Sequence, residues 1–288
     1  MFHALDHVIV CVRDLADATR RYATLFGRRP SWRGEHPGWG SANTLFRLEN
    51  TYLELLAPAG EGPIGDLLRG RLGEVGEGAF GLALATADAA AARATLAERG
   101  LEPAEVSEGV GRDADSGLFR RWRNVMLPAE RTRGVFVFAI EHRSPPEMLP
   151  PAEVAGDAKA AISGIDHAVV QSPDADAAIA LWGDALGLRL ALDRSFPDWG
   201  MRLCFLRVGG VTVEIAQPLD GSAAVEGDRL WGLSWRVPDA DAAHDRLVAA
   251  GVEVSAVRKG RKPGTRVLSV KDGTCGVPTL LLEPATSD

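Results

Sequence analysis

Short apolar runs and alanine-rich segments follow one another in a fixed order along this chain of 288 residues. An apolar or β-branched run leads to an Asp, then to a segment with helical spacing of its apolar residues, then to a Gly and further short apolar runs. Because Asp favours helix N-caps and Gly favours left-handed C-caps, each middle segment is predicted to be a helix, and each unit to fold as β-α-β-β-β. Four such units occupy about residues 4–58, 79–142, 163–218 and 230–285, with Asp14, Asp88, Asp174 and Asp239 as expected N-caps and Gly27, Gly100, Gly187 and Gly251 as expected C-caps.

The third and fourth units repeat the first and second. LDHVIV at 5–10 returns as IDHAVV at 165–170, and TYLELLAP at 51–58 returns as VTVEIAQP at 211–218, both at an offset of 160 residues. Such a fixed offset indicates a duplication. The first copy carries an extra loop between Pro58 and Gly81, and the proline-rich stretch 143–161 has no strand pattern. We therefore expect an α+β protein with two domains, at 1–142 and 162–288, joined by a linker at 143–161.

Alternation within the strands predicts which side chains share a face of the sheet. In the first strand three valines form the apolar face, which leaves His7 on the opposite one. In the strand that ends at Pro58, two leucines pack with these valines, which leaves Glu54 on the side of His7. The second copy orients His167 and Glu214 in the same way. Each copy is thus predicted to bring a His and a Glu together on the face turned away from the helices.

Charge and composition exclude several classes of partner. The net charge of −7 argues against general binding of nucleic acid or of an anionic membrane, because both need a basic surface. The N-terminus has no basic region, and its apolar run is too short for a signal peptide or a membrane span. Three widely spaced cysteines without a CxxC pair suit a reducing cytoplasm. We expect a cytoplasmic protein that binds a small molecule, and a homodimer is compatible with the sequence.

A β-α-β-β-β unit with DHxxx in its first strand and a Glu in its last resembles the vicinal oxygen chelate superfamily. That superfamily includes glyoxalase I, extradiol dioxygenases, methylmalonyl-CoA epimerase and the fosfomycin and bleomycin resistance proteins. The resemblance covers nearly the whole chain, as two tandem glyoxalase-like domains, and is closest in HPGWGSANTLFRLENTYLELLAP of the first copy. It implies that two units curl into an eight-stranded cup with helices outside, and that this cup can hold a divalent metal.

The metal site of that superfamily takes a His or Gln and a Glu from one unit, and a His and a Glu from its partner. By this resemblance His7 and Glu54 would be ligands in the first cup, and His167 and Glu214 in the second. The ion would be Ni, Zn, Fe, Mn or Co. Two ligands in each cup are fewer than the three protein ligands that catalytic metal sites usually supply.

The partner units depart from the superfamily pattern. Alignment places Gly81 and Phe138 where the first domain would need its second His and second Glu. His142 lies on the strand face of Phe138 and is a further candidate ligand. Pairing of the first unit with the third would instead gather both His–Glu pairs into one complete set. Alternatively the cups hold no metal, and each His and Glu form a charge-assisted pair with each other or with a ligand.

Other side chains are candidates for contact with a ligand. Arg120 and Trp122 share one face of a predicted strand in SGLFRRWRNVMLP at 116–128, while the two neighbouring arginines share the other. Inside the first cup, a guanidinium and an indole could hold a carboxylate or phosphate and stack on a planar group, whereas on the outer face they would only be solvated. In the second cup Ser234 and Arg236 are the corresponding candidates, and Arg236 could instead pair with Glu214.

The segment GEHPGWGSAN at 34–43 contributes His36, Trp39 and Asn43 and resembles the entrance region of glyoxalase-like domains. Because Phe196 replaces His36 in the second copy, His36 is a candidate acid, base or ligand donor specific to the first cup, with an exposed surface histidine as the alternative. Trp39 recurs as Trp199. That recurrence favours a shared structural role, and Trp39 is also a candidate for substrate contact.

These residues lead to one main functional hypothesis and two alternatives. The main one is a small-molecule enzyme of lyase, isomerase or dioxygenase type, in which a divalent cation polarises an oxygen of an anionic or aromatic substrate and Glu54 or Glu214 acts as ligand or base. The first alternative is a metal-free protein that sequesters an aromatic or drug-like molecule in an apolar cup lined by Phe138, Leu280 and tryptophans. In the second, one domain is a degenerate scaffold for the other. The sequence contains no nucleophile elbow, phosphate loop, dinucleotide fingerprint or clustered Cys/His zinc pattern.

Overall fold

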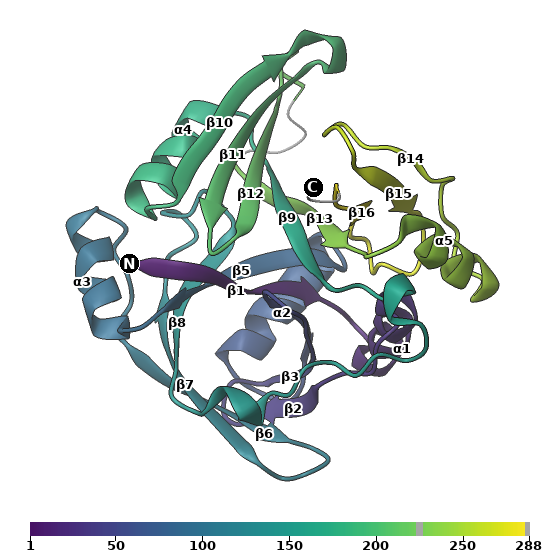
Figure 1. Cartoon of the computed structure of the whole chain (residues 1–288). Helices are drawn as coiled ribbons and strands as arrows, with labels where there is room; N and C mark the ends of the chain where they lie inside the picture. The colour runs from purple at the N-terminus through teal and green to yellow at the C-terminus, as the bar shows by residue number, and fades with distance from the viewer. Residues whose placement is uncertain (223–226, 286–288) are drawn as a thin grey trace.

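A computed structural model describes residues 1–222 and 227–285 of the chain. Its first half contains two β-α-β-β-β units (Figure 1). The first unit consists of β1 (Phe2–Cys11), α1 (Leu15–Phe26), β2 (Trp32–His36), β3 (Ser41–Arg47) and β4 (Tyr52–Pro58). The second consists of β5 (Gly78–Thr86), α3 (Ala89–Glu98), β6 (Ser107–Asp113), β7 (Phe119–Met126) and β8 (Phe136–His142).

These eight strands close into a barrel in the order β1-β4-β3-β2-β6-β7-β8-β5. β1 runs parallel to β4 and antiparallel to β5, so the first unit joins the second along its first strand. The opposite closure, between β2 and β6, pairs only Gly34 and Glu35 with Asp113 and Arg112. Consecutive units therefore pair, and the alternative pairing of the first and third units is wrong.

The second half repeats the arrangement but leaves its sheet open. Its strands lie in the order β10-β11-β12-β9-β13-β16-β15-β14, and the edge strand β14 is only two residues long. The third unit consists of β9 (Gly164–Gln171), α4 (Ala175–Ile179) with a π-helical continuation (Ala180–Ala185), β10 (Arg189–Phe196), β11 (Met201–Val208) and β12 (Val211–Pro218). The fourth consists of β13 (Arg229–Arg236), α5 (Ala240–Ala249), β14 (Arg258–Lys259), β15 (Arg266–Val270) and β16 (Thr279–Glu283).

The predicted helix caps are confirmed in all four units. Each of the four aspartates has an extended backbone and accepts hydrogen bonds from backbone N–H groups of the first helical turn, as an N-cap does. All four glycines have a positive φ, between 62° at Gly27 and 78° at Gly100 and Gly187. Because L-residues with a side chain rarely adopt this conformation, glycine ends each helix without strain.

The predicted strand faces are also confirmed. Val8 and Val10 of β1, and Val12 directly after it, are fully buried in the main hydrophobic core, together with the leucines of β4 and the apolar faces of the helices. His7 and Glu54, on the opposite faces of β1 and β4, line the barrel interior. Because side chains alternate along a strand, the outer face packs in the core and the inner face carries His7 and Glu54.

The segment between β4 and β5, expected to be a loop, contains the helix α2 (Pro63–Glu74). Proline at the first helical position has a φ that suits a helix start. Leu68 and Leu72, one turn apart, are buried against Ile9, Cys11 and Phe138 of the barrel interior. The insertion therefore covers one end of the first barrel with apolar side chains.

The outer faces of the two sheets share one hydrophobic core. The ring of Phe26, at the end of α1, packs 4.8 Å from that of Trp235 in β13, and both side chains are fully buried. Tyr22 donates a hydrogen bond of 3.0 Å to the carbonyl of Thr274. The segment 143–161 runs along this body, with buried Leu149 and Ala152. The barrel and the open sheet therefore pack against one another through their outer faces.

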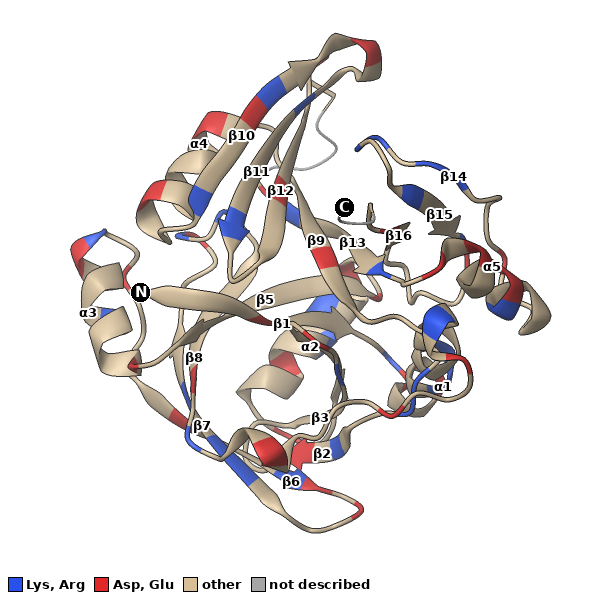
Figure 2. Cartoon of the chain, viewed as in Figure 1, with Lys and Arg blue, Asp and Glu red and all other residues tan. Residues whose placement is uncertain are grey.

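Positive and negative residues are interspersed over the strands and helices of both halves (Figure 2). Among the described residues, no helix is long and apolar enough to cross a membrane.

Candidate functional site

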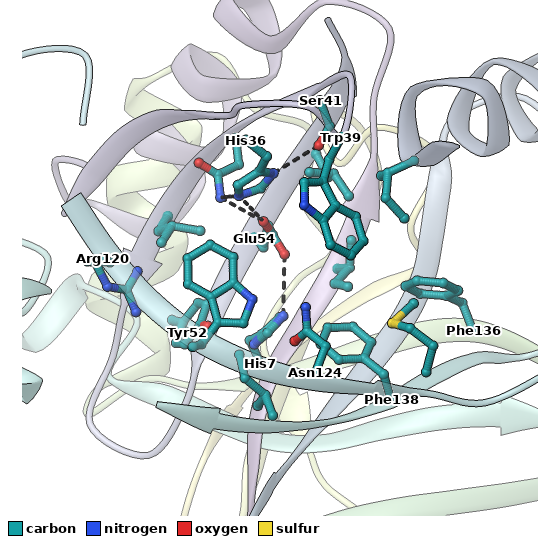
Figure 3. A pocket seen from close by; sticks show the side chains of 18 of the residues that line it. His7, His36, Trp39, Ser41, Tyr52, Glu54, Arg120, Asn124, Phe136 and Phe138 are labelled. Atoms are coloured by element: carbon teal, nitrogen blue, oxygen red, sulfur yellow. Dashed lines mark hydrogen bonds and ion pairs between the residues drawn. The ribbon is translucent and has the colours of Figure 1, made fainter. Parts of the chain in front are cut away.

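The interior of the first barrel encloses a cavity of about 80 Å³ (Figure 3). We call this cavity and its walls the first cup. Its lining is mostly apolar, with an aromatic wall formed by Trp122, Phe136 and Phe138. Its polar side chains come from six strands, namely His7 of β1, His36 of β2, Ser41 and Asn43 of β3, Glu54 of β4, Arg120 and Asn124 of β7, and His142 of β8.

Register places His7 beside Glu54. β1 and β4 are adjacent parallel strands in which Ile9 is level with Glu54 and His7 with Tyr52, so the two polar side chains lie on neighbouring rungs of one face. Nε2 of His7 lies 3.3 Å from Oε2 of Glu54. The approach is not aligned as a hydrogen bond, however, and Nε2 is buried without a hydrogen-bond partner. This ring nitrogen is therefore held near a carboxylate but remains available to a ligand.

The other side of the His7 ring is fixed by Asp6. Nδ1 of His7 donates to Oδ1 of Asp6 at 2.7 Å, and Nε2 of His142 donates to the second oxygen at 2.8 Å. Burial alone would lower the pKa of His7, but the hydrogen bond to Asp6 and the charge of Glu54 raise it to about 9. Burial would likewise raise the pKa of Glu54, but His7 holds it below its usual value. At neutral pH the pair is thus an imidazolium beside a carboxylate.

A second network orients Glu54 from the side of His36. The amide nitrogen of Asn43 donates to Oε1 of Glu54 at 2.7 Å and to Nε2 of His36 at 3.1 Å. Since Nε2 accepts, the proton of His36 lies on Nδ1, which donates to the hydroxyl of Ser41 at 2.9 Å. Burial lowers the pKa of His36. His36 is therefore a neutral imidazole, in contrast to His7.

Alternation along β7 turns Arg120, Trp122 and Asn124 into the first cup. Arg121 is exposed on the outer face, and Arg123 pairs there with Glu108 at 2.8 Å. The indole of Trp122 lies across Gly109 of β6, where an added Cβ would come within 2.2 Å of the indole nitrogen. Glycine at this position thus provides the space that lets Trp122 form a wall of the cavity.

Arg120 is the one buried arginine among the residues that the structure describes, with 7% of its surface exposed. Its guanidinium lies 5.5 Å from the ring centre of Trp32 and 6.0 Å from that of Tyr52. It makes no hydrogen bond or ion pair to any residue within the described ranges. An aromatic cradle without an acidic partner leaves the charge of Arg120 uncompensated.

Two buried acceptors in the same cavity also lack partners. They are the side-chain oxygens of Asn43 and Asn124. The orientation of Asn43 is fixed, because its nitrogen donates to both Glu54 and His36. Buried polar atoms are normally satisfied, so unpartnered ones facing a cavity indicate places where a ligand or water binds. The first cup therefore presents a cationic donor at His7 and neutral acceptors at Asn43 and Asn124.

The residues of the first cup fit a divalent metal only in part. The 3.3 Å between His7 and Glu54 is a spacing that two ligands of one ion, each about 2.0–2.2 Å from it, can adopt. No group of three His, Cys, Asp or Glu side chains that could hold an ion occurs in residues 1–222 and 227–285, however. The nearest third donor, His36, already accepts from Asn43 and lies 4.0 Å from Glu54. This donor set does not fit a tightly held catalytic metal.

The position where the superfamily pattern puts its second His is also filled. A Cβ on Gly81 would lie 2.6 Å from the ring of Phe136 and 2.7 Å from its carbonyl oxygen. Phe136 in turn stacks on Phe80 with ring centres 4.6 Å apart. Phe138, at the second Glu position, contacts His7 edge-on at 5.6 Å. Aromatic packing thus occupies the half of the cup where further ligands would be.

The second sheet brings together its own His–Glu pair, which is more widely spaced and less deeply buried than the first. Nε2 of His167 lies 3.7 Å from Oε2 of Glu214, and Nδ1 donates to Asp166 at 2.9 Å. Nε of Arg236 donates to the other oxygen of Asp166 at 3.1 Å, in the place that His142 takes beside Asp6. Burial raises the pKa of Glu214, opposite to the shift of Glu54.

Ser234 is buried beside this pair in the second sheet, and its hydroxyl lacks a partner. Trp199 is 41% exposed, and Arg261 stacks on it 3.7 Å from the ring centre, so the basic turn at 259–266 leans on an aromatic side chain.

The structure gathers one group of the candidate residues and separates another. His7, His36, Trp39, Glu54, Arg120, Trp122 and His142 line one cavity, whereas His167, Glu214, Ser234 and Arg236 belong to the other sheet. Sequence reasoning named Asn43 with His36 and Trp39, but it did not single out Asp6 or Asn124 as site residues. Asp6 recurs as Asp166, and Asn124 follows Arg120 and Trp122 at strand spacing, so both signals were present in the sequence.

Comparison with known proteins agrees with the fold. Residues 5–164 match the family model of the glyoxalase-like domain, and residues 166–268 match that of the glyoxalase/bleomycin resistance protein/dioxygenase superfamily. A segment is 27% identical over 130 residues to the ethylmalonyl-CoA/methylmalonyl-CoA epimerase of Cereibacter sphaeroides, covering 43% of this chain and 90% of the epimerase.

Two solved structures are similar over nearly the whole chain. A variant of 4-hydroxymandelate synthase from Streptomyces coelicolor has a TM-score of 0.69 at 14% identity, covering 98% of this chain and 92% of its own. A hypothetical protein from Staphylococcus aureus has a TM-score of 0.66 at 12% identity, covering 96% and 98%. At these identities the likeness concerns the arrangement of the two sheets.

Proposed function

Because the chain belongs to the glyoxalase-like domain family of the vicinal oxygen chelate superfamily, whose relatives include enzymes, we propose that it is a small-molecule isomerase or lyase acting in the first cup. The observation that carries this proposal is the pairing of His7 and Glu54 in a buried, mostly apolar cavity. We propose further that residues 1–142 and 162–288 are its two domains, that it acts in the cytoplasm, and that a homodimer is compatible with this role.

The proposed reaction is proton transfer at a carbon next to a carbonyl group. Glu54 is ionised at neutral pH and takes the proton, while the unpartnered Nε2–H of His7 donates to the carbonyl oxygen as negative charge develops on it. Asn43 holds Glu54 in place, and its free oxygen accepts from a substrate hydroxyl or amide. Trp39 and Trp122 pack against the uncharged body of the substrate.

Proton transfer suits this donor set better than oxygen activation. His7 and Glu54 are only two ligands, so an ion in the first cup would need water molecules to complete its coordination. As an acid and a base, in contrast, the two side chains already carry opposite charges and lie 3.3 Å apart. The family's divalent metal would polarise a substrate oxygen where it is bound, and in this cup the imidazolium of His7 supplies that charge. His167, Glu214, Ser234 and Arg236 then serve the second sheet without catalysis.

The experiment is hydrogen exchange catalysed by the protein. We would incubate it in D₂O with 2-oxo carboxylates, 2-hydroxy carboxylates and 1,3-dicarbonyl compounds and follow the loss of each C–H signal by proton NMR. Exchange is expected for at least one class, slowed about 100-fold or more by Glu54→Gln. Glu214→Gln is the matched control and should leave the rate unchanged. Exchange that depends on Glu214 and not on Glu54 contradicts the proposal.

The aromatic wall of the first cup favours a second candidate function. Trp122, Phe136 and Phe138 could sequester an aromatic molecule without any reaction. The same samples distinguish the two, because a sequestering protein binds aromatic compounds with equal affinity in wild type and Glu54→Gln and exchanges no proton in either.

A further inference from the structure

A second cavity of about 280 Å³ lies next to the first cup. The two cavities share Tyr52, Arg120 and His142 in their walls. The second cavity is bounded by the start of β1, the β3–β4 turn and the residues that follow β8, and it is more polar than the cup. Arg120 therefore faces two spaces of different character, one apolar and one polar.

The acidic and amide side chains nearest to Arg120 in the second cavity are already engaged, and Glu49, which also lines this cavity, is exposed and makes no ion pair with Arg120. The acceptors of Asn50 and Asp6 are engaged, since Asn50 binds the backbone of Ile165, and Asp6 accepts from His7 and His142. The hydroxyl of Ser144 accepts from the backbone of Arg121, which leaves its own proton free. A buried guanidinium without an ion-pair partner among the described residues is destabilised by desolvation unless an anion binds it.

We propose that Arg120 forms an anion-binding subsite at the junction of the two cavities. It takes a carboxylate or phosphate group of a ligand whose uncharged body lies in the first cup. The planar fork of a guanidinium binds either group through two parallel hydrogen bonds, and the rings of Trp32 and Tyr52 contact the guanidinium of Arg120. This assignment rests on the proposed function only in making the ligand the substrate, since the subsite binds anions whether or not a reaction follows.

Isothermal titration calorimetry with paired probes tests the subsite. The pair is 3-phenylpropanoate and 3-phenylpropanamide, which differ in charge but hardly in shape. The wild-type protein should bind the acid about tenfold or more tightly than the amide, and Arg120→Met should abolish this preference. Arg121→Met is the matched control, because Arg121 is the next residue of β7, points outward and should leave the preference intact.

Two further arms keep the result decisive. If Arg120→Met fails to fold, Arg120→Gln replaces it, with the same loss of preference expected. Phenyl phosphate identifies the head group. If it binds more tightly than the acid, the subsite takes a phosphate, and the reverse order assigns a carboxylate. Inorganic phosphate alone measures the affinity of the subsite without a contribution from the first cup. Equal binding of acid and amide by wild type, or an unchanged preference in the Arg120 variants, overturns the assignment.

These outcomes are independent of catalysis. If the protein prefers the acid through Arg120 but exchanges no proton, the anion subsite is supported and the proposed enzymatic function is contradicted. Exchange that depends on Glu54, in a protein that binds acid and amide equally, keeps the enzyme and removes the subsite.

Discussion

Nε2 of His7 lies 3.3 Å from Oε2 of Glu54 without an aligned hydrogen bond between them. The two groups attract each other by charge, yet Nε2 of His7 is buried at the wall of the first cup without a hydrogen-bond partner. An attraction without a full hydrogen bond leaves a proton donor that a ligand can use.

The raised pKa of His7 makes a prediction about pH and stability. Its folded-state pKa of about 9 exceeds the ordinary value of 6.5, so the stabilisation from its ion pairs is complete below about pH 6.5 and is lost as the pH rises through 9. Urea unfolding of wild type and His7→Gln at about pH 6 and pH 10 measures it. The difference in unfolding free energy between the two proteins should be smaller at the higher pH, and a constant difference contradicts the assigned charge state.

The absence of a side chain at Gly109 lets the indole of Trp122 form a wall of the first cup. In Gly109→Ala the new Cβ would come within 2.2 Å of the indole nitrogen of Trp122, so the indole must move. We expect a loss of about 1–3 kcal/mol of unfolding free energy and weaker binding of aromatic ligands. Gly73→Ala is the control, because Gly73 lies in α2 with nothing near its Cβ position, and alanine there should stabilise by about 0.5–1 kcal/mol. Unchanged ligand affinity in Gly109→Ala would show that Trp122 does not wall the site.

Metal titration checks the donor set of the first cup. With two donors and no third among the described residues, Zn²⁺ and Ni²⁺ should bind only weakly, and mutation of the pair should change little. Calorimetry with each ion on wild type and His7→Ala, after removal of bound metal with a chelator, provides the measurement. A tightly bound stoichiometric ion that His7→Ala abolishes would contradict this prediction and restore the metal-dependent hypothesis.

Much of the architecture could be predicted from the sequence because its signals are local. The α+β fold and the resemblance to the vicinal oxygen chelate superfamily are both confirmed. Caps such as Asp14 and Gly27 depend on one residue each, and strand alternation places His7 and Glu54 inside without reference to distant contacts. Because the second half of the chain repeats the first, the same reasoning applies to both halves.

The features that could not be predicted depend on packing between residues that are far apart in the sequence. The helix α2 contains three glycines, a poor helical signal, and gains its stability from Leu68 and Leu72 packing into the barrel. Whether Gly81 left a vacancy depended on Phe136, which fills it from another strand. The sequence pattern also did not show that one sheet closes into a barrel while the other stays open, with an edge strand β14 of only two residues.

Contact between the two halves leads to the last prediction. Phe26 is fully buried and packs on Phe46 of its own half and on Trp235 of the other, at 5.4 Å and 4.8 Å between ring centres. Phe26→Ala should therefore cost about 3–5 kcal/mol and weaken both sheets together. Hydrogen exchange followed by mass spectrometry should show faster exchange in β13 as well as in β3. Val248→Ala, at a position 52% exposed on α5, is the control and should change stability by less than about 0.5 kcal/mol. Faster exchange confined to β3 would mean that the halves unfold independently, since a shared core cannot lose one ring without loosening the strands on either side of it.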